Sequence, residues 1–309
     1  MSSSRIVSVF GATGLQGSAV VDALLKDGTF TPRAITRNPD SEKSLELKER
    51  GVQVVKADSG DKASLVSALQ GSEAVFGARV TVPIFPPIRT SGPNELTQGK
   101  NMVDAAKEAG IKFFIFSSLP SLKKLSGGKY PNVSLCEDKD AIEEYLRASG
   151  LASASLHLGA FLENFLTNGL LKKTSTGFNI TAPGNYSPTS LKAFSWVQRD
   201  VGESALTLLK NYTDLTKNIS GKSYPVITAL MTFPDLVTMI SKALGVEVTF
   251  TSVATIGIPM FDEMSAAQSE YNGIFTAAQV PNPDLVALGA KFGTMEQFME
   301  KEMKKRFSQ

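Results

Sequence analysis

Three glycines near the start of the chain have the spacing of a phosphate-binding turn. Gly11, Gly14 and Gly17 stand in the stretch VFGATGLQGSAVV, a G-x-x-G-x-x-G spacing related to the G-x-G-x-x-G dinucleotide fingerprint. Glycine permits a tight turn and a close approach of pyrophosphate, and a following helix directs its free N–H groups at that phosphate. A tight turn without a ligand remains the alternative. The residues expected to contact a dinucleotide here are Gly11, Thr13, Gly14, Leu15, Gln16 and Gly17.

A basic residue follows the second predicted strand, in the stretch Thr36-Arg37-Asn38-Pro39. Dehydrogenases that prefer NAD place an acidic residue here to bind the ribose hydroxyls. A guanidinium instead can bind a 2′-phosphate with two hydrogen bonds and stack on adenine. Arg37 therefore favours NADP as the cofactor, with NAD still possible and a plain surface arginine as the alternative.

Further contacts are expected where the later strands end, because ligands of such sheets bind at the carboxyl ends of the strands. After the third strand, Asp58 and Ser59 are expected near adenine. After the fourth, Ala78, Val80 and Thr81 are expected along the nicotinamide ribose. After the fifth, Ser117 is expected to face a substrate. Packing at the end of a strand is the alternative for Ser117 and for its neighbour Ser118.

The elements that position these residues alternate between strand and helix, which predicts a parallel sheet in a doubly wound α/β fold. A glycine follows each predicted helix, at Gly28, Gly51, Gly71, Gly110 and Gly150. The predicted strands are Ile6–Phe10, Arg33–Thr36, Val52–Lys56, Ala74–Ala78, Phe113–Ser117 and Ser153–Leu158. The predicted helices are Ser18–Lys26, Ser41–Arg50, Asp61–Leu69, Asn94–Ala109 and Asp138–Ser149.

The alternation weakens after about residue 160, which predicts a smaller α+β region on the substrate side. Residues 1–158 are expected to form the dinucleotide-binding domain, and residues 159–309 the smaller region, with some segments returning to the main sheet. Gly177 to Pro188 reads as turn-rich, and the stretch from Ala254 to Val280 is rich in Met, Ile and Phe. Asp200–Lys210 and Pro234–Leu244 are predicted as helices and Val246–Thr251 as a strand.

Composition excludes several classes of protein. The chain has 309 residues and a net charge of +2, so no strong attraction to nucleic acid or membranes is expected. It contains one cysteine, Cys136, and one histidine, His157, which makes a zinc site improbable and fits a reducing compartment. We expect a cytoplasmic protein for which nuclear entry is possible. His157 is expected in a strand near the cofactor rather than as a catalytic base.

Several stretches together resemble the NmrA-like family, a branch of atypical short-chain dehydrogenases/reductases. They are VFGATGLQG, ITRNP, TQGKNMVDAAKEAGIKFFIFSSL, DKDAIEEYLRASGL and LGAFLENF, within residues 5 to 165. The chain is also similar to the isoflavone- and phenylcoumaran-reductase group. The resemblance implies a Rossmann domain that binds NAD(P) beside a smaller C-terminal region. Some family members are reductases, whereas others resemble redox sensors that bind the dinucleotide and a regulatory partner protein.

The acid/base pair of typical short-chain dehydrogenases, Tyr-x-x-x-Lys, is incomplete. Leu135 stands four residues before Lys139, and the spacings of Tyr130 and Tyr145 do not suit a pairing on one helix face. In the isoflavone-reductase group, a lysine at the place of Lys139 is thought to act as general acid/base. Such a role needs a lowered pKa, which the charges of Asp138 and Asp140 would oppose if they lie near Lys139.

The segment Phe161-Leu162-Glu163-Asn164 matches the family's F-x-E-N pattern, so Phe161 is expected in the apolar wall and Asn164 near the nicotinamide or substrate. Local capping and core packing are the alternative. The apolar loop Pro83–Ile88 suits a planar aromatic or quinone-like substrate and a protein surface equally well. Two functions therefore stay open. One is an NADP(H)-binding regulatory protein, and the other is an NADPH-dependent reductase in which Lys139 assists proton transfer.

Overall fold

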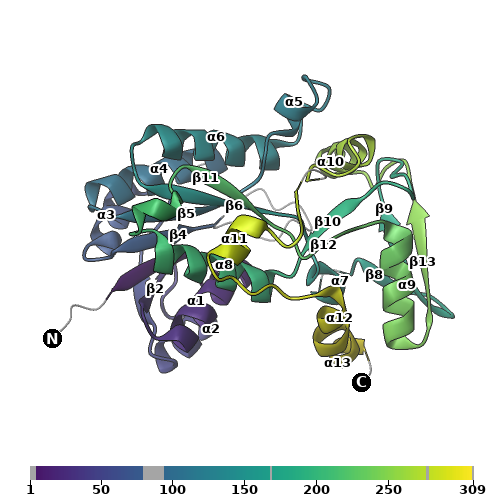
Figure 1. Cartoon of the computed structure of the whole chain (residues 1–309), viewed down its shortest axis with the longest axis horizontal. Coiled ribbons are helices and arrows are strands. Elements are labelled where there is room, and N and C mark those ends of the chain that lie inside the picture. Colours follow the sequence, from purple (N-terminus) through teal and green to yellow (C-terminus); the bar gives the residue numbers. More distant parts are fainter. Residues whose placement is uncertain (1–4, 79–93, 168, 276–277, 308–309) are drawn as a thin grey trace.

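The computed structural model describes residues 5–78, 94–167, 169–275 and 278–307 (Figure 1). Its centre is a parallel sheet in the strand order β11-β6-β5-β4-β1-β2-β3. The strands are β1 (Ile6–Phe10), β2 (Thr31–Thr36), β3 (Gln53–Lys56), β4 (Ala74–Gly77), β5 (Phe113–Ser118), β6 (Ser153–Leu158) and β11 (Lys222–Val226). Strand order reverses between β1 and β4, which confirms the predicted Rossmann-type doubly wound fold.

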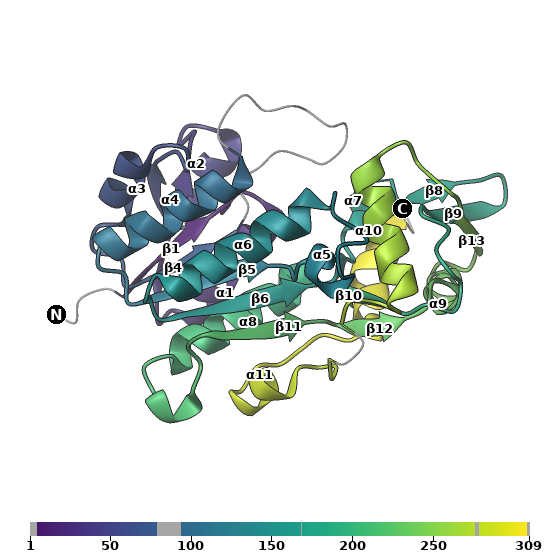
Figure 2. The same cartoon turned by 90° about the horizontal axis from the view of Figure 1, so that it is seen from above.

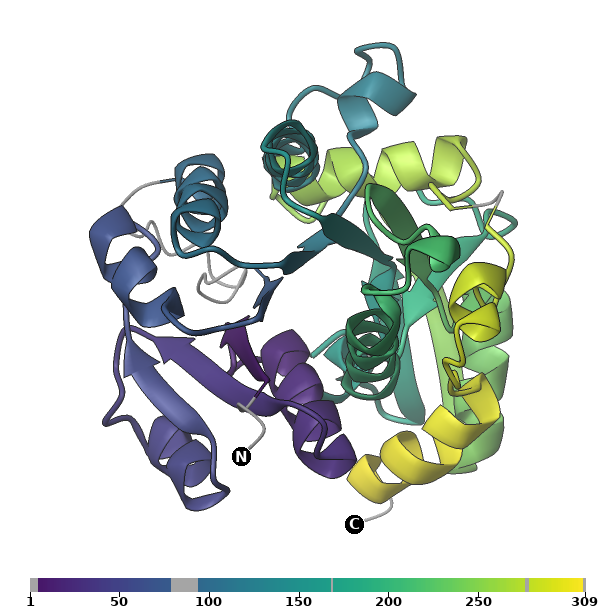
Figure 3. The same cartoon turned by 60° about the vertical axis from the view of Figure 1, so that its left-hand side comes forward.

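Helices cover both faces of this sheet (Figure 3). The helices α1 (Leu15–Asp27), α2 (Glu42–Glu49) and α8 (Val197–Asn211) contribute to the core on one face. The opposite face packs against α3 (Lys62–Leu69), α4 (Glu95–Glu108) and α6 (Ser134–Ala148). The stretch GKNMVDAAKEAG thus places its apolar side, including Met102 and Val103, against the sheet, as an amphipathic helix should.

The C-terminal region lies beside the carboxyl ends of the strands (Figures 1 and 2). One small sheet has the order β12-β10-β7, from β7 (Ala160–Phe161), β10 (Lys192–Ser195) and β12 (Ala229–Met231). The other has the order β13-β9-β8, from β8 (Leu171–Lys173), β9 (Gly177–Ala182) and β13 (Glu247–Ser252). The helical segments of this region are α7 (Asn164–Thr167), α9 (Phe233–Leu244), α10 (Pro259–Glu270), α11 (Pro283–Ala287), α12 (Met295–Phe298), η2 (Met299–Met303) and α13 (Lys304–Phe307).

Two late segments return to the main sheet. The strand β11 pairs in parallel with β6, and α8 packs against α1. Gly202 of α8 allows this close packing, because a Cβ at its position would lie 2.3 Å from the backbone oxygen of Ala19 in α1. The short segments α5 (Leu122–Leu125) and η1 (Leu215–Lys217) lie in connections.

Several predicted boundaries and one predicted segment were wrong. The helices α1, α6 and α8 each begin three or four residues before the predicted start. The segment read as turn-rich from Gly177 forms β9 as far as Ala182. Gly177 is a strand residue there because the backbone of β13 approaches it, so that a Cβ would lie 1.9 Å from the oxygen of Glu247. The stretch from Ala254 to Val280 contains α10.

Candidate functional site

The glycine turn joins β1 to α1 and is built from backbone contacts. Gly11 has a φ of 65°, in the left-handed region that favours glycine. The N–H of Gly14 donates to the oxygen of Gly11 over 2.8 Å. A Cβ at Gly17 would lie 2.2 Å from the same oxygen. The turn therefore requires glycine at positions 11 and 17 for its own geometry.

The start of α1 has no side-chain cap, in contrast to the starts of α2, α3 and α4. The helices α2, α3 and α4 are capped by the side chains of Ser41, Asp61 and Asn94, whereas Gly14 at the N-cap of α1 supplies none. The buried Oε1 of Gln16 also has no hydrogen-bond partner among the described residues. The first turn of α1 thus combines free backbone donors with one unsatisfied side-chain oxygen, as a ligand-binding helix end would.

Arg37 lies beside this turn. Phe10 at the end of β1 pairs with Ile35 of β2, so Arg37 follows β2 at the same edge of the sheet. Its side chain is exposed and forms no hydrogen bond or ion pair with the residues that the structure describes. Lys43 in the first turn of α2 brings a second cation, with its Nζ 3.5 Å from the oxygen of Thr13. Lys43 was not predicted to lie at the site, because no local sequence pattern links α2 to the turn.

The structure places Asp58 and Ser59 at the carboxyl end of β3, in a loop held by local bonds. The Asp58 carboxylate accepts from the N–H of Gly60 over 2.8 Å. The Ser59 hydroxyl is buried and donates to Gln98 of α4 over 2.9 Å. Asp58 is therefore exposed at this edge, while Ser59 connects the loop to α4.

The candidates after β4 and β5 are described only in part. Ala78 is buried directly after β4, and Val80 and Thr81 lie outside the described residues, as does the loop Pro83–Ile88. Ser117 is a buried residue within β5.

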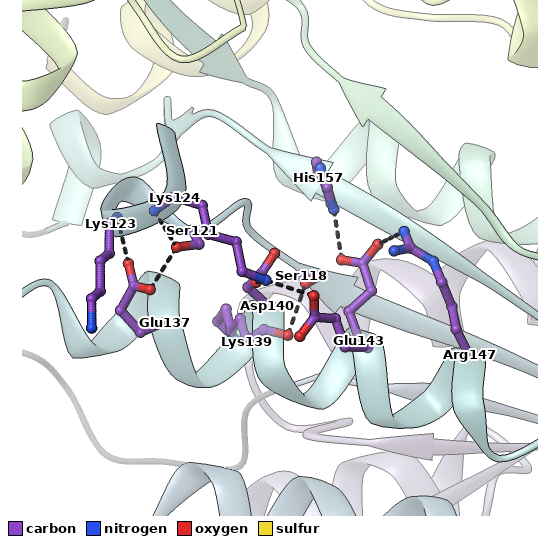
Figure 4. A network of polar contacts seen from close by, with 11 residues as sticks. Ser118, Ser121, Lys123, Lys124, Glu137, Lys139, Asp140, Glu143, Arg147 and His157 are labelled. Atoms are coloured by element: carbon purple, nitrogen blue, oxygen red, sulfur yellow. Dashed lines mark hydrogen bonds and ion pairs between the residues drawn. The ribbon is translucent and has the colours of Figure 1, made fainter. Parts of the chain in front are cut away.

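Lys139 lies on α6 and forms a buried ion pair. Its Nζ is 2.8 Å from Oε1 of Glu95, in the first turn of α4, and the two side chains are 7% and 9% exposed. The Nζ also lies 5.7 Å from the centre of the Phe116 ring. The neighbouring Asp140 instead pairs with Lys124 (Figure 4). The carboxylate paired with Lys139 therefore comes from another helix, and no local spacing in the sequence signalled this pairing.

The two nearby tyrosines have partners elsewhere. The Tyr145 hydroxyl donates to Asp104 of α4 over 2.7 Å, and that hydrogen bond raises the pKa of Tyr145. The Tyr130 hydroxyl donates to Glu270 of α10 over 2.5 Å, and burial is the main cause that raises its pKa. Both contacts fit the expectation that neither residue completes a Tyr-x-x-x-Lys pair.

Glu143 on α6 is another buried carboxylate, and it accepts several hydrogen bonds (Figure 4). His157 Nε2 donates to Glu143 Oε2 over 2.7 Å, and the Ser223 hydroxyl donates to Oε1 over 2.5 Å. Arg147 also pairs with this carboxylate. Burial alone would raise the pKa of Glu143, but the hydrogen bond and charge of His157 and the hydrogen bond from Ser223 oppose it, and the pKa is lowered to about 2. His157 lies in β6 as predicted and serves here as a partner of Glu143.

The F-x-E-N segment contributes to core packing and to the capping of a helix. Phe161 lies in β7 and packs against the main core, and Asn164 begins α7. Glu163 is the residue that caps, because its carboxylate accepts from the N–H groups of Val197 and Gln198 at the start of α8, over 3.2 and 2.8 Å. Burial is the main cause that raises the pKa of Glu163.

The described part of the chain contains neither a candidate metal site nor a helix that could cross a membrane. No group of three or more histidine, cysteine, aspartate or glutamate side chains in residues 5–78, 94–167, 169–275 and 278–307 could hold a metal ion. Within the same ranges, no helix has both the length and the apolar character needed to cross a membrane.

Two curated fungal proteins have similar sequences. The NmrA-like family domain-containing oxidoreductase hkm9 of Aspergillus hancockii is 30% identical over 84% of this chain and 80% of its own length. The oxidoreductase FrzB of Cladobotryum sp., named for the same domain, is 41% identical over 52% of this chain. The match spans about half of FrzB, 48% of its length.

Solved structures share the fold at low sequence identity. NmrA, described as a negative transcriptional regulator, is similar in its complexes with NADP and with NAD, with TM-scores of 0.79 and 0.80 at 18% and 19% identity. Both matches cover 99% of this chain and 97% of NmrA. The NADPH-dependent quinone oxidoreductase QOR2 of Escherichia coli, complexed with NADPH, has a TM-score of 0.70 at 23% identity, over 95% of this chain and 98% of QOR2.

The model of the NmrA-like family matches residues 3–299, nearly the whole chain. Together with the fold and the glycine turn, this match shows that the protein belongs to the NmrA-like family.

Proposed function

We propose that this protein binds NADP(H) at the carboxyl edge of its main sheet and acts as a redox-sensing or regulatory dinucleotide binder. The observation that carries the proposal is the start of α1, where a glycine turn precedes a helix without a side-chain cap. A diphosphate supplies acceptors for those backbone donors and is favoured by the positive end of the helix dipole. Structures of NmrA with NADP and with NAD, in the same fold, support this placement.

The preference for NADP over NAD rests on the two cations beside the turn. Arg37 is exposed and has no partner among the described residues, and Lys43 lies against the turn itself. A 2′-phosphate, which NAD lacks, would accept two charged hydrogen bonds from the Arg37 guanidinium.

The remaining contacts follow the edge of the sheet. We propose that Asp58 and Ser59 lie near adenine, that Ala78, Val80, Thr81 and Ser117 line the nicotinamide half, and that Lys139 binds near the nicotinamide ribose. Phe161 and Asn164 are proposed to border the same half from the C-terminal region. The dinucleotide itself would supply hydride chemistry, and the residues of this chain would hold and orient it.

A regulatory role is favoured over turnover by the state of the polar groups near Lys139. Neither Tyr130 nor Tyr145 is paired with this lysine, and Lys139 is already bound to Glu95. NmrA is described as a negative transcriptional regulator, which supports a partner protein as the reader of the bound state. The compartment proposed for this function is the cytoplasm, with nuclear entry possible.

Titration of the whole chain with NADPH and NADH by calorimetry tests the proposal. We expect NADPH to bind more tightly than NADH, and Arg37→Ala to weaken NADPH by about 10- to 30-fold, as loss of a charged hydrogen-bonded pair would. The same substitution should leave the affinity for NADH within about twofold. Equal affinity of the parent for both dinucleotides would overturn the preference, and absence of binding would overturn the function.

A reductase is the second candidate, favoured by the relatives named as oxidoreductases and by the fold shared with QOR2. In this case NADPH would reduce an aromatic or quinone-like acceptor, and Lys139 would assist proton transfer. NADPH oxidation with a panel of small quinones, in the parent and in Lys139→Ala, tests it. Turnover that is lost in the variant would support the reductase, whereas tight NADPH binding without turnover would favour the regulatory protein.

A further inference from the structure

The pair formed by Lys139 and Glu95 differs from every other lysine ion pair in the described residues. The lysine side chains of those other pairs are 41% to 58% exposed, against 7% for Lys139. Exposed pairs contribute little to stability and impose little order, whereas a buried pair strongly resists the loss of either partner. The environment of Lys139 is therefore organised by one carboxylate, 44 residues away in the sequence.

Three contacts, two from β5 and one from α4, fix the position of this ammonium group. The hydroxyl of Ser118, at the end of β5, donates to the backbone oxygen of Lys139 over 3.2 Å and anchors α6 to the sheet (Figure 4). The ring of Phe116 in β5 lies near the Nζ. Glu95 approaches from α4, whose N-cap is Asn94. The lysine is thus held at the carboxyl edge of β5.

Charged groups surround the pair on two helices. Glu95 lies in the first turn of α4, where the helix dipole stabilises a carboxylate. On α6, Asp138 and Asp140 flank the lysine, and Asp140 pairs with Lys124 from α5. The adjoining strand β5 contributes the uncharged Phe116 and Ser118.

We propose that Glu95 is a positioning residue that keeps Lys139 as a fixed, cationic hydrogen-bond donor to the bound dinucleotide. This inference rests on the proposed NADP(H) binding and adds the residue that controls the lysine. An ammonium group has three N–H donors and no acceptor, so a lysine held in this form can bind ribose oxygens but cannot accept a proton. Glu95 thereby biases the site toward holding the cofactor rather than toward a lysine that acts as a base.

The first test needs no dinucleotide. Glu95→Gln leaves the buried ammonium without its counter-ion, so the folded state comes to favour the neutral amine. The unfolded chain then binds more protons in alkaline solution, and the stability of the variant rises with pH relative to the parent.

We expect Glu95→Gln to have a lower Tm than the parent at pH 7, and this difference in Tm should narrow by pH 10. Adding Lys139→Met to Glu95→Gln should recover Tm at pH 7. Glu108→Gln, which removes an exposed carboxylate from the same helix, is the matched control and should behave as the parent.

The second test measures NADPH affinity of the same variants from pH 7 to pH 9.5. Lys139→Met should weaken binding by about tenfold at every pH, as the loss of one charged hydrogen bond would. The NADPH affinity of Glu95→Gln should be close to that of the parent at pH 7 and should fall to that of Lys139→Met by pH 9.5. The double variant should match Lys139→Met throughout, because Glu95 acts through the lysine.

Each contrary result has a distinct meaning. If Lys139→Met binds NADPH as the parent does, or if Glu95→Gln follows the parent at every pH, the inference is overturned while the proposed function stands. If the parent itself binds no NADPH, the proposed function fails and the inference fails with it. A Tm of Glu95→Gln that equals the parent's at pH 7 would show that the pair does not control the charge of Lys139.

Discussion

Polar groups lack partners within the described protein at one end of the site and are paired at the other. At the glycine end, formed by Gly11–Gly17 and Arg37, the helix start has no side-chain cap and the guanidinium has no partner among the described residues. At the lysine end, formed by Glu95, Lys139, Glu143 and His157, the buried charges are paired within the protein. Because unsatisfied groups gain most from a ligand, the proposed dinucleotide would gain most of its binding energy at the glycine end. The charges of the lysine end are already paired without a ligand.

The largest expected effect is at Gly17. In Gly17→Ala, the new Cβ would lie 2.2 Å from the oxygen of Gly11, so the turn must move. We expect NADPH affinity to fall by more than about a hundredfold, because a cost of about 3 kcal/mol is typical of a severe overpacking. Calorimetry measures this change. Gly110→Ala, at another turn with a φ of 73° and open space for the Cβ, controls for loss of stability alone. Equal losses of affinity in both variants would break the comparison between the two ends.

An intermediate effect is expected at the lysine end, in stability rather than in binding. The pKa of Glu143 is lowered from its ordinary 4.5 to about 2, so ionised Glu143 contributes stability above pH 4.5. That contribution is lost as the pH falls through about 2, and it amounts to about 3 kcal/mol. Urea unfolding between pH 2 and pH 6 should show a weaker pH dependence in Glu143→Gln than in the parent. Glu144→Gln, at an exposed position of the same helix, should retain the parent's slope. An unchanged slope in Glu143→Gln would show that the network does not hold this carboxylate ionised.

The smallest expected effect concerns Lys43. Its ammonium lies against the turn but is exposed, so Lys43→Ala should weaken NADPH binding by about two- to fivefold, the size of a screened surface interaction. The loss should shrink at 0.5 M salt, and fluorescence titration at low and high salt measures it. Lys48→Ala on the same helix is the control. A salt-independent loss would mean that Lys43 supports the turn itself and not the ligand's charge.

Local sequence signals predicted most of the main sheet. The strands Ile6–Phe10 and Ser153–Leu158 coincide with the prediction, and the glycines after the predicted helices all have positive φ. These features depend on neighbouring residues alone. The start of α1 was misplaced because Gly17 is a poor helix former and its position is set by contact with Gly11. The strand β9 pairs locally with the short β8 and, about seventy residues away, with β13, and only the first of these pairings could leave a signal in the local sequence.

The glycine end of the site was predictable for the same reason, since its residues are consecutive. The pairing of Lys139 with Glu95 and of Glu143 with His157 was not, because each joins different elements. A contact across the sheet edge leaves no periodic pattern in the sequence. The sequence therefore indicated which residues are polar at this edge and not which of them neutralise one another.

Amide hydrogen exchange of the whole chain with and without NADPH tests the central claim most directly, because it reports on the backbone donors at the start of α1. We predict that NADPH slows exchange in the peptide covering Gly14–Ser18 more than in the peptide at the start of α3, which Asp61 already caps. NADPH binding that leaves exchange at Gly14–Ser18 unchanged would contradict the account, because the phosphates would then lie elsewhere.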